Sequence, residues 1–188
     1  MLSTLIDPEI ILKMLEELEK ENEKYKGIVF STRQYFFADP LMPIYENNFA
    51  VGNKLAFELF KNKNKDGFYI SMDINNFKLI NTINHEEGDK AITTIGYTLR
   101  KCTNNLNRSK LFRSGGDEFV FFSEIKEDIY LFIDKVIVEL NKLDLINNKI
   151  KMTLSFGIGK TYLDAENALL LAKKRKTEIS NPIHELLE

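Results

Sequence analysis

The chain has 188 residues, of which 44% are hydrophobic and 29% charged, and this composition excludes a disordered protein. Its 26 basic and 28 acidic residues leave a formal charge of −2, which argues against coating a nucleic acid polymer by charge but not against a local phosphate-binding pocket. The single cysteine, Cys102, excludes an internal disulfide, and without a long apolar run or a signal-peptide pattern we expect a soluble cytoplasmic protein with no membrane partner.

The first segment, residues 1–26, predicts a helix that begins near Asp7, Pro8 and Glu9. A 4-3-4-3 spacing then relates Ile11, Leu15, Leu18, Asn22 and Tyr25. Two interpretations stay open, a dimerising coiled coil and an amphipathic helix docked on its own domain. Residues 27–48 contain two prolines and predict a linker that meets the domain near Asp39.

Residues 49–180 predict one α+β domain, followed by a tail over 181–188. Hydrophobic periodicity and turn signals predict, in chain order, helix 51–60, strand 67–74, helix 75–80, helix 86–101, strand 110–113, turn 114–117, strand 118–122, helix 124–140, strand 149–158 and helix 164–173. Hairpin-linked strands mixed with helices predict a central, antiparallel-containing sheet with helices packed on it.

Acidic residues stand at the ends of two predicted strands. Asp73 closes one strand, and Asp117 with Glu118 follows a tight turn. Carboxylates that a sheet brings together repel one another, and a hard divalent cation with oxygen ligands would remove that cost. The alternative is that each acid only caps a turn.

Two further features point to a nucleotide phosphate group. Gly115 and Gly116 allow a positive φ or the close approach of a ligand. The segment 73–78 offers consecutive N–H groups near a helix start, which suit phosphate oxygens, and Lys78 could add a positive charge. The alternatives are an ordinary hairpin turn and a solvated lysine.

Several ordered segments resemble the motifs of one known family, the GGDEF domains or diguanylate cyclases. The run RSGGDEF at 113–119 resembles the family signature. The other matching segments are DINNFKLIN at 73–81, HEEGD at 85–89, MTLSFGI at 152–158, the Ala172-Lys173 pair and the Asp39-Pro40-Leu41 start of an N-terminal motif. The resemblance covers about residues 39–177.

The resemblance implies a palm-like nucleotidyl cyclase fold with a ferredoxin-like core. It also implies that two GTP molecules, one in each subunit of a homodimer, condense to cyclic di-GMP and release pyrophosphate. By that resemblance Asp73, the Ile74 carbonyl and Asp117 would hold two Mg²⁺ (or Mn²⁺) ions. Glu118 would lie beside the attacking 3′-hydroxyl and help to deprotonate it.

The same resemblance assigns the groups that would hold the GTP. The N–H groups of Asn76 and Phe77, together with Lys78 and Lys173, would neutralise the β- and γ-phosphates. Asn81 and Asp89 would bind guanine, whose N1–H and 2-amino groups offer a carboxylate a donor pair that adenine lacks.

The sequence departs from the family pattern in several places, three of which bear on the nucleotide site. The N-terminal motif loses its Thr and Arg in the segment 41–47, the loop between Asn81 and Asp89 is one residue shorter, and a second phosphate-binding basic residue is replaced by Thr177. Two alternatives to an active diguanylate cyclase therefore stay open: a weak or inactive GTP-binding regulatory module, and a palm cyclase that makes a different cyclic or linear nucleotide.

Overall fold

The computed structural model describes most of the chain, namely residues 7–21, 29, 31–32, 36–42, 51–62, 66–106, 108–144, 150–175 and 180–187. Within these ranges no helix has the length and apolar character needed to cross a membrane. Predictions that involve Asn22, Tyr25 or Thr177 lie outside the described residues.

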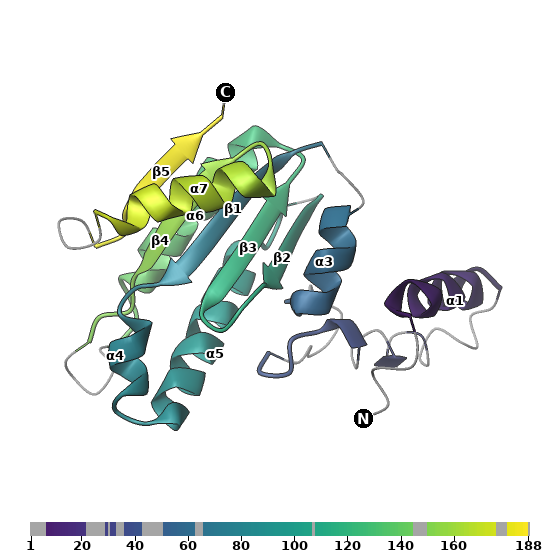
Figure 1. Cartoon of the computed structure of the whole chain (residues 1–188), viewed down its shortest axis with the longest axis horizontal. Coiled ribbons are helices and arrows are strands. Elements are labelled where there is room, and N and C mark those ends of the chain that lie inside the picture. The colour runs from purple at the N-terminus through teal and green to yellow at the C-terminus, as the bar shows by residue number, and fades with distance from the viewer. Residues whose placement is uncertain are drawn as a thin grey trace.

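A five-stranded mixed sheet forms the centre of the molecule (Figure 1). Its strands are β1 (Phe68–Ile74), β2 (Ser109–Arg113), β3 (Glu118–Ser123), β4 (Leu154–Gly159) and β5 (Ile183–Leu186). They lie in the order β2-β3-β1-β4-β5, and all neighbours are antiparallel except β4 and β5, which are parallel. The predicted α+β class with a mostly antiparallel sheet is therefore confirmed.

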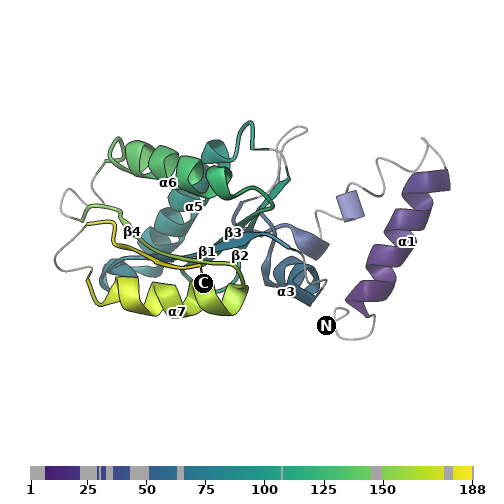
Figure 2. The same ribbon diagram turned by 90° about the horizontal axis from the view of Figure 1, so that it is seen from above.

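Helices cover both faces of this sheet. They are α3 (Lys54–Asn62), α4 (Phe77–Asn81), α5 (His85–Cys102), α6 (Lys126–Leu140) and α7 (Tyr162–Lys173). Viewed along the sheet, α5 and α6 lie on one side and α3 and α7 on the other (Figure 2). β1 leads into α4 and then into α5 without a long loop. The candidate site therefore lies at the C-terminal end of β1, the central strand of the sheet.

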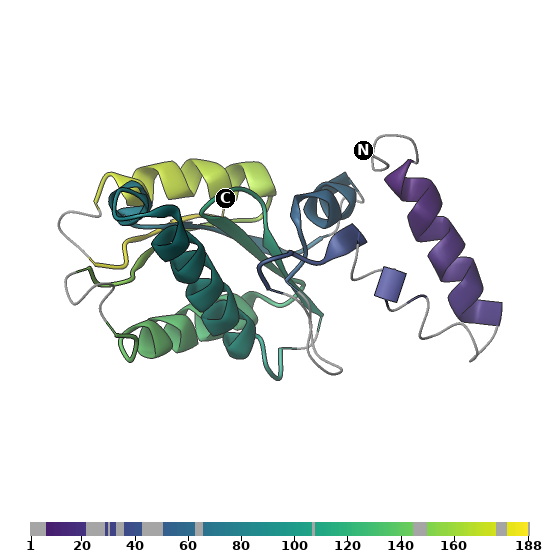
Figure 3. The same cartoon turned by 90° about the horizontal axis from the view of Figure 1, so that it is seen from below.

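The predicted N-terminal helix is present as α1 (Pro8–Glu21) and lies beyond α3 at the side of the domain (Figure 3). Leu15 is only 4% exposed, whereas Ile10 and Met14 are 52% and 56% exposed. Part of the apolar surface of α1 is thus covered within the single chain. The coiled coil over residues 1–26 stays a prediction.

Alternation along the strands divides the core into two clusters. Ile70, Met72 and Ile74 of β1 point to the α5/α6 face and join the larger cluster. On that side the ring of Phe121 stacks on Phe132 of α6 with centroids 4.0 Å apart. Tyr69 points to the α3/α7 face, where a second cluster contains the aromatic rings of Phe57, Phe112 and Phe122. By the same alternation Ser71, Asp73 and Glu118 face α3 and α7, so this face carries polar groups toward one end.

The sequence located most elements within a few residues, with two differences. β4 begins at Leu154 rather than at 149, and residues 151–153 before it are not part of the strand, although the carbonyl of Thr153 still accepts the N–H of Asn75. β5 was not expected, since the sequence indicated only a tail there. The N–H of Phe156 donates to Pro182, and four residues then pair with β4 in parallel.

Candidate active site

The acidic ends of β1 and of the β2–β3 hairpin lie side by side. Asp73 is the partner of Glu118 in the antiparallel pairing of β1 and β3. The next residue, Ile74, donates its N–H to the carbonyl oxygen of Asp117 at 3.2 Å. Since Cβ atoms of directly opposed residues lie about 5 Å apart, carboxylates from both elements converge at one edge of the sheet.

The two glycines of the hairpin turn act differently from the sequence expectation. Neither Gly115 nor Gly116 has a positive φ, so the turn does not need glycine for its backbone conformation. A Cβ at Gly115 would lie 2.7 Å from Oε2 of Glu118, whereas a Cβ at Gly116 would meet nothing within 4 Å. Gly115 therefore leaves room for the Glu118 carboxylate, and Gly116 leaves open space beside Asp117.

Burial and mutual repulsion disfavour the charged forms of these acids. The pKa of Asp117 is raised by burial and by the neighbouring charge of Asp73. The pKa of Glu118 is raised by burial and by the charge of Glu166, a residue of α7. A positive charge placed among these oxygens would lower the energy of the ionised cluster.

Two lysines face this negative charge. Nζ of Lys173, at the end of α7, lies 2.6 Å from Oδ2 of Asp73, and both side chains are largely shielded, with 29% and 14% exposure. Lys78 on α4 is exposed, and the charges of Lys173 and Lys78 both act to lower the pKa of Asp117. In this structure Lys173 thus binds the acid rather than standing free for a phosphate.

The turn after β1 is held by Asn75, which the sequence did not single out. Its buried amide donates to Oγ1 of Thr153 at 3.0 Å and accepts from Oγ of Ser155 at 2.6 Å. The next residue, Asn76, adopts a left-handed conformation with φ 60° and occupies the N-cap position of α4, without a capping hydrogen bond from its side chain. The first N–H groups of a helix have no partner within it, and those of α4 follow Asp73 closely in the chain. Their role as phosphate donors stays a prediction.

The predicted guanine-binding residues lie on neighbouring helices. Asn81 ends α4, and Asp89 is exposed in the second turn of α5. A Cβ at Gly88 would collide with Oδ1 of Asn81, so the Asn81 side chain lies directly against the start of α5. Asn84 caps α5 by accepting the N–H of Glu87 at 2.7 Å. The shorter loop therefore still brings Asn81 close to the α5 turn that carries Asp89.

A nearly buried ion pair joins the hairpin turn to the segment before α3. Nη1 of Arg113 lies 3.2 Å from Oδ2 of Asp39, with side-chain exposures of 16% and 5%. Nε and Nη2 of Arg113 also donate to the carbonyl of Gly116, at 3.0 and 2.8 Å. The sequence indicated both residues through motifs but did not predict that they pair.

A family model described as "Diguanylate cyclase, GGDEF domain" matches residues 39–179, about three quarters of the chain. The chain belongs to the GGDEF family. A comparison with curated proteins found no match.

Solved structures similar to this GGDEF domain share its fold at low identity. The GGDEF domain of DgcB from Caulobacter crescentus is 18% identical with a TM-score of 0.60, over 80% of this chain and 95% of that one. The coiled coil and GGDEF domain of the same protein is 16% identical with a TM-score of 0.61, over 95% and 99%. Diguanylate cyclase SiaD from Pseudomonas aeruginosa is 19% identical with a TM-score of 0.63, over 94% and 73%. The predicted palm-like fold is confirmed.

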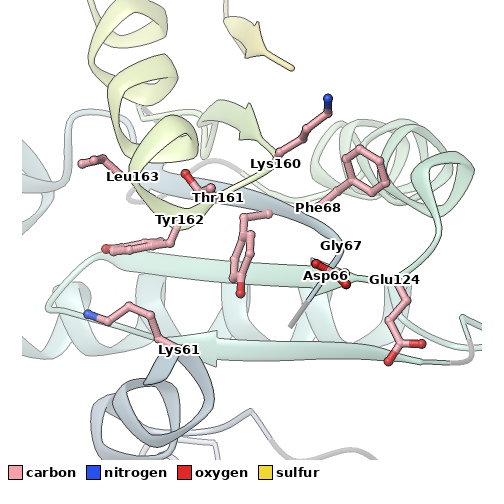
Figure 4. A pocket seen from close by; sticks show the side chains of 10 residues that line it. Lys61, Asp66, Gly67, Phe68, Glu124, Lys160, Thr161, Tyr162 and Leu163 are labelled. Atoms are coloured by element: carbon pink, nitrogen blue, oxygen red, sulfur yellow. The ribbon is translucent and has the colours of Figure 1, made fainter. Parts of the chain in front are cut away.

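The opposite end of β1 carries a cavity of about 800 Å³ that none of the predicted site residues lines (Figure 4). Its walls include Tyr69, Tyr162 and Lys61. The ring of Tyr162 packs edge-on against Phe57 with centroids 4.8 Å apart, so this residue is a packed element of the domain as well as a cavity wall.

Proposed function

We propose that this GGDEF domain is a diguanylate cyclase that condenses two GTP molecules to cyclic di-GMP and releases pyrophosphate. The observation that carries the proposal is the convergence of Asp73, Asp117 and Glu118 at the end of β1, next to Lys173. The two similar DgcB structures from Caulobacter crescentus were solved in complex with c-di-GMP. Membership of the same family supports the same class of substrate here.

The residues present fit a hard divalent cation, Mg²⁺ or Mn²⁺, held by Asp73, Asp117 and the Ile74 carbonyl. The pKa of Asp117 is raised by burial and by the charge of Asp73, and a bound cation would favour the ionised carboxylate against both effects. In the part of the chain that the structure describes, no group of three or more acidic, histidine or cysteine side chains is arranged to hold a metal ion alone. Mg²⁺ usually binds one or two carboxylates and completes its shell with substrate phosphates and water. Bound metal would supply Lewis acidity toward the α-phosphate and lower the pKa of the 3′-hydroxyl.

The side chains of the site would orient GTP and take up its proton. Glu118 would accept the proton of the 3′-hydroxyl as the new phosphodiester bond forms and the bond to pyrophosphate breaks. The N–H groups of Asn76 and Phe77, with Lys78 and Lys173, would bind the leaving phosphates. For this, Lys173 must exchange Asp73 for a phosphate oxygen.

Asn81 and Asp89 would select guanine, because their positions on α4 and α5 border one surface at the start of α5. An Asp carboxylate can accept from N1–H and the 2-amino group together. GTP should therefore bind more tightly than ATP, and Asp89→Ala should reduce this preference.

Two nucleotides in one product require two sites that face each other, so we propose a homodimer. Residues 1–26 would pair as a coiled coil, and one similar DgcB structure includes such a segment. Light scattering tests this: removing residues 1–26 should lower the mass in solution and slow the reaction at low protein concentration. Unchanged mass and rate would remove the coiled coil from the proposal.

A second candidate is a GTP-binding module that does not turn over. It is favoured by Thr177, which stands where the family has a second basic phosphate ligand. A third outcome is turnover to a different cyclic or linear nucleotide.

The test is to incubate the pure 188-residue chain with Mg²⁺ and each nucleoside triphosphate and to resolve the products by mass spectrometry. We expect cyclic di-GMP from GTP alone, and none from Asp117→Ala. GTP binding without pyrophosphate release at high protein concentration would leave only the regulatory module. A different nucleotide product would leave only the third candidate.

A further inference from the structure

One flank of α7 follows β1 from the cavity to the carboxylates. Tyr162, Glu166 and Lys173 are spaced by four and seven residues, which places them on the same side of the helix. Ser71 and Asp73 are two residues apart on β1 and share the face toward α7. Lys173 forms an ion pair with Asp73, and Glu166 accepts a hydrogen bond from Ser71. This flank of α7 therefore contacts two successive residues on the same face of β1.

Glu166 accepts a hydrogen bond from the sheet. Oγ of Ser71 on β1 donates to Oε1 of Glu166 on α7. Ser71 is 1% exposed, so its hydroxyl requires an acceptor within the protein. Gly157, the partner of Ser71 on β4, has no side chain that would block Glu166.

Three of the four buried residues of α7 are alanines. The buried residues of α7 are Ala165, Ala168, Leu169 and Ala172. They lie over Gly157 and Gly159, where an added Cβ would collide with the backbone of α7. Such a surface permits a close approach but has few interlocking side chains to set how far the helix is rotated or shifted. A specific polar contact between α7 and the sheet can fix this rotation and shift.

We propose that Glu166 is a positioning residue: by accepting from Ser71 of β1 it sets the rotation and register of α7, and thereby places Lys173 beside Asp73. Lys173 is then aligned with the edge of the sheet where the phosphates would bind. The link to phosphate binding rests on the proposed function, whereas the placement of Lys173 does not.

The first test measures the position of Lys173 without any nucleotide. Limited acetylation followed by mass spectrometry gives the rate at Lys173 relative to Lys174, an exposed neighbour that serves as internal reference. In the wild type the ion-paired Lys173 should react more slowly. Glu166→Ala should raise the Lys173/Lys174 ratio by about fivefold, as expected when a shielded ion pair is lost.

Three variants separate position from charge and from general destabilisation. Glu166→Gln keeps an oxygen acceptor and should stay close to the wild-type ratio. Ser71→Ala removes the donor on β1 and should fall between the wild type and Glu166→Ala. Asn167→Ala, a change at an exposed site on the same helix, should leave the ratio unchanged. An unchanged ratio in Glu166→Ala, or an equal rise in Glu166→Gln, would overturn the positioning role.

The second test compares the affinity for 3′-deoxy-GTP, which cannot react, with that for GMP. Glu166→Ala should weaken binding of the triphosphate by about tenfold and that of GMP by less than about twofold, since only the triphosphate reaches Lys173. In a Lys173→Ala background, Glu166→Ala should cause no further loss. Parallel losses for both nucleotides, or a further loss in that background, would show a merely structural role. If the wild type binds neither nucleotide, the proposed function fails while the acetylation result still decides the positioning role.

Discussion

The ion pair between Asp39 and Arg113 offers a quantitative test of how the hairpin turn is held. The relevant variants are Asp39→Ala, Arg113→Met and the double variant. Each single change leaves one charge shielded from water without its partner, at a pair separated by 3.2 Å with exposures of 5% and 16%. Asp39 additionally accepts the N–H of Leu41 at 3.0 Å, and Arg113 additionally binds the carbonyl of Gly116.

These contacts set the expected size of the effect. Removing one partner of a buried ion pair costs about 3–5 kcal/mol, and Asp39→Ala should fall near the lower value because Arg113 keeps two bonds and some contact with water. Arg113→Met should cost about 4 kcal/mol, since it also removes the bonds to Gly116. The double variant should be less destabilised than the sum by about 2 kcal/mol, because no unpaired charge remains.

The free energies of unfolding can be measured by urea denaturation followed by circular dichroism. Glu124→Gln is the matched control, since Glu124 pairs with Arg108 at 3.7 Å with exposures of 39% and 70%, and it should cost less than about 1 kcal/mol. A coupling free energy below about 0.5 kcal/mol between Asp39 and Arg113 would refute the reasoning, because the effects of mutations at independent sites add to within about that amount.

Three further experiments, two with substitutions and one with a thiol reagent, test the site and the core. Asp117→Asn should abolish turnover yet raise the melting temperature of the metal-free protein at neutral pH, because the pKa of Asp117 is raised on folding and its ionised form opposes folding. The gain in melting temperature should vanish as the pH falls below about 4, the pKa of an Asp in the unfolded chain. A loss of stability at neutral pH would contradict this reasoning. Gly88→Ala should displace the Asn81 side chain and weaken GTP binding about tenfold, as measured by calorimetry. The free energy of unfolding should stay unchanged or rise by up to about 1 kcal/mol, because Ala favours the helix more than Gly. Unchanged affinity would show that Asn81 does not contact the guanine base. The thiol of Cys102, whose pKa is raised to about 11 mainly by burial, should not react with a disulfide reagent at mildly alkaline pH until urea is added, and rapid reaction of the folded protein would contradict its burial.

Local patterns carried most of the fold prediction. The 3.6-residue spacing of Ala91, Ile92, Ile95 and Leu99 predicted α5, and all four residues are buried. The sequence placed acids at the end of β1 and in the β2–β3 turn, at Asp73 and Asp117, but they meet only because β1 pairs with β3, a strand that is distant in the chain. The failures have equally local reasons. β5 is a short strand with an exposed edge and no apolar run, and Gly115 is required for the space beside Glu118 rather than for its φ.

By itself the sequence determined the order of helices and strands, the acidic groups and the family to which they belong, since these depend on residues close together in the chain. Only the tertiary structure decided which groups meet across the site. Arg113 and Asp39 are 74 residues apart, and Ser71 and Glu166 are 95 apart. Such contacts depend on strand register and on the rotation of α7, to which no pattern within a short window is sensitive. For the same reason the sequence assigned Lys173 to a phosphate, and the structure pairs it with Asp73.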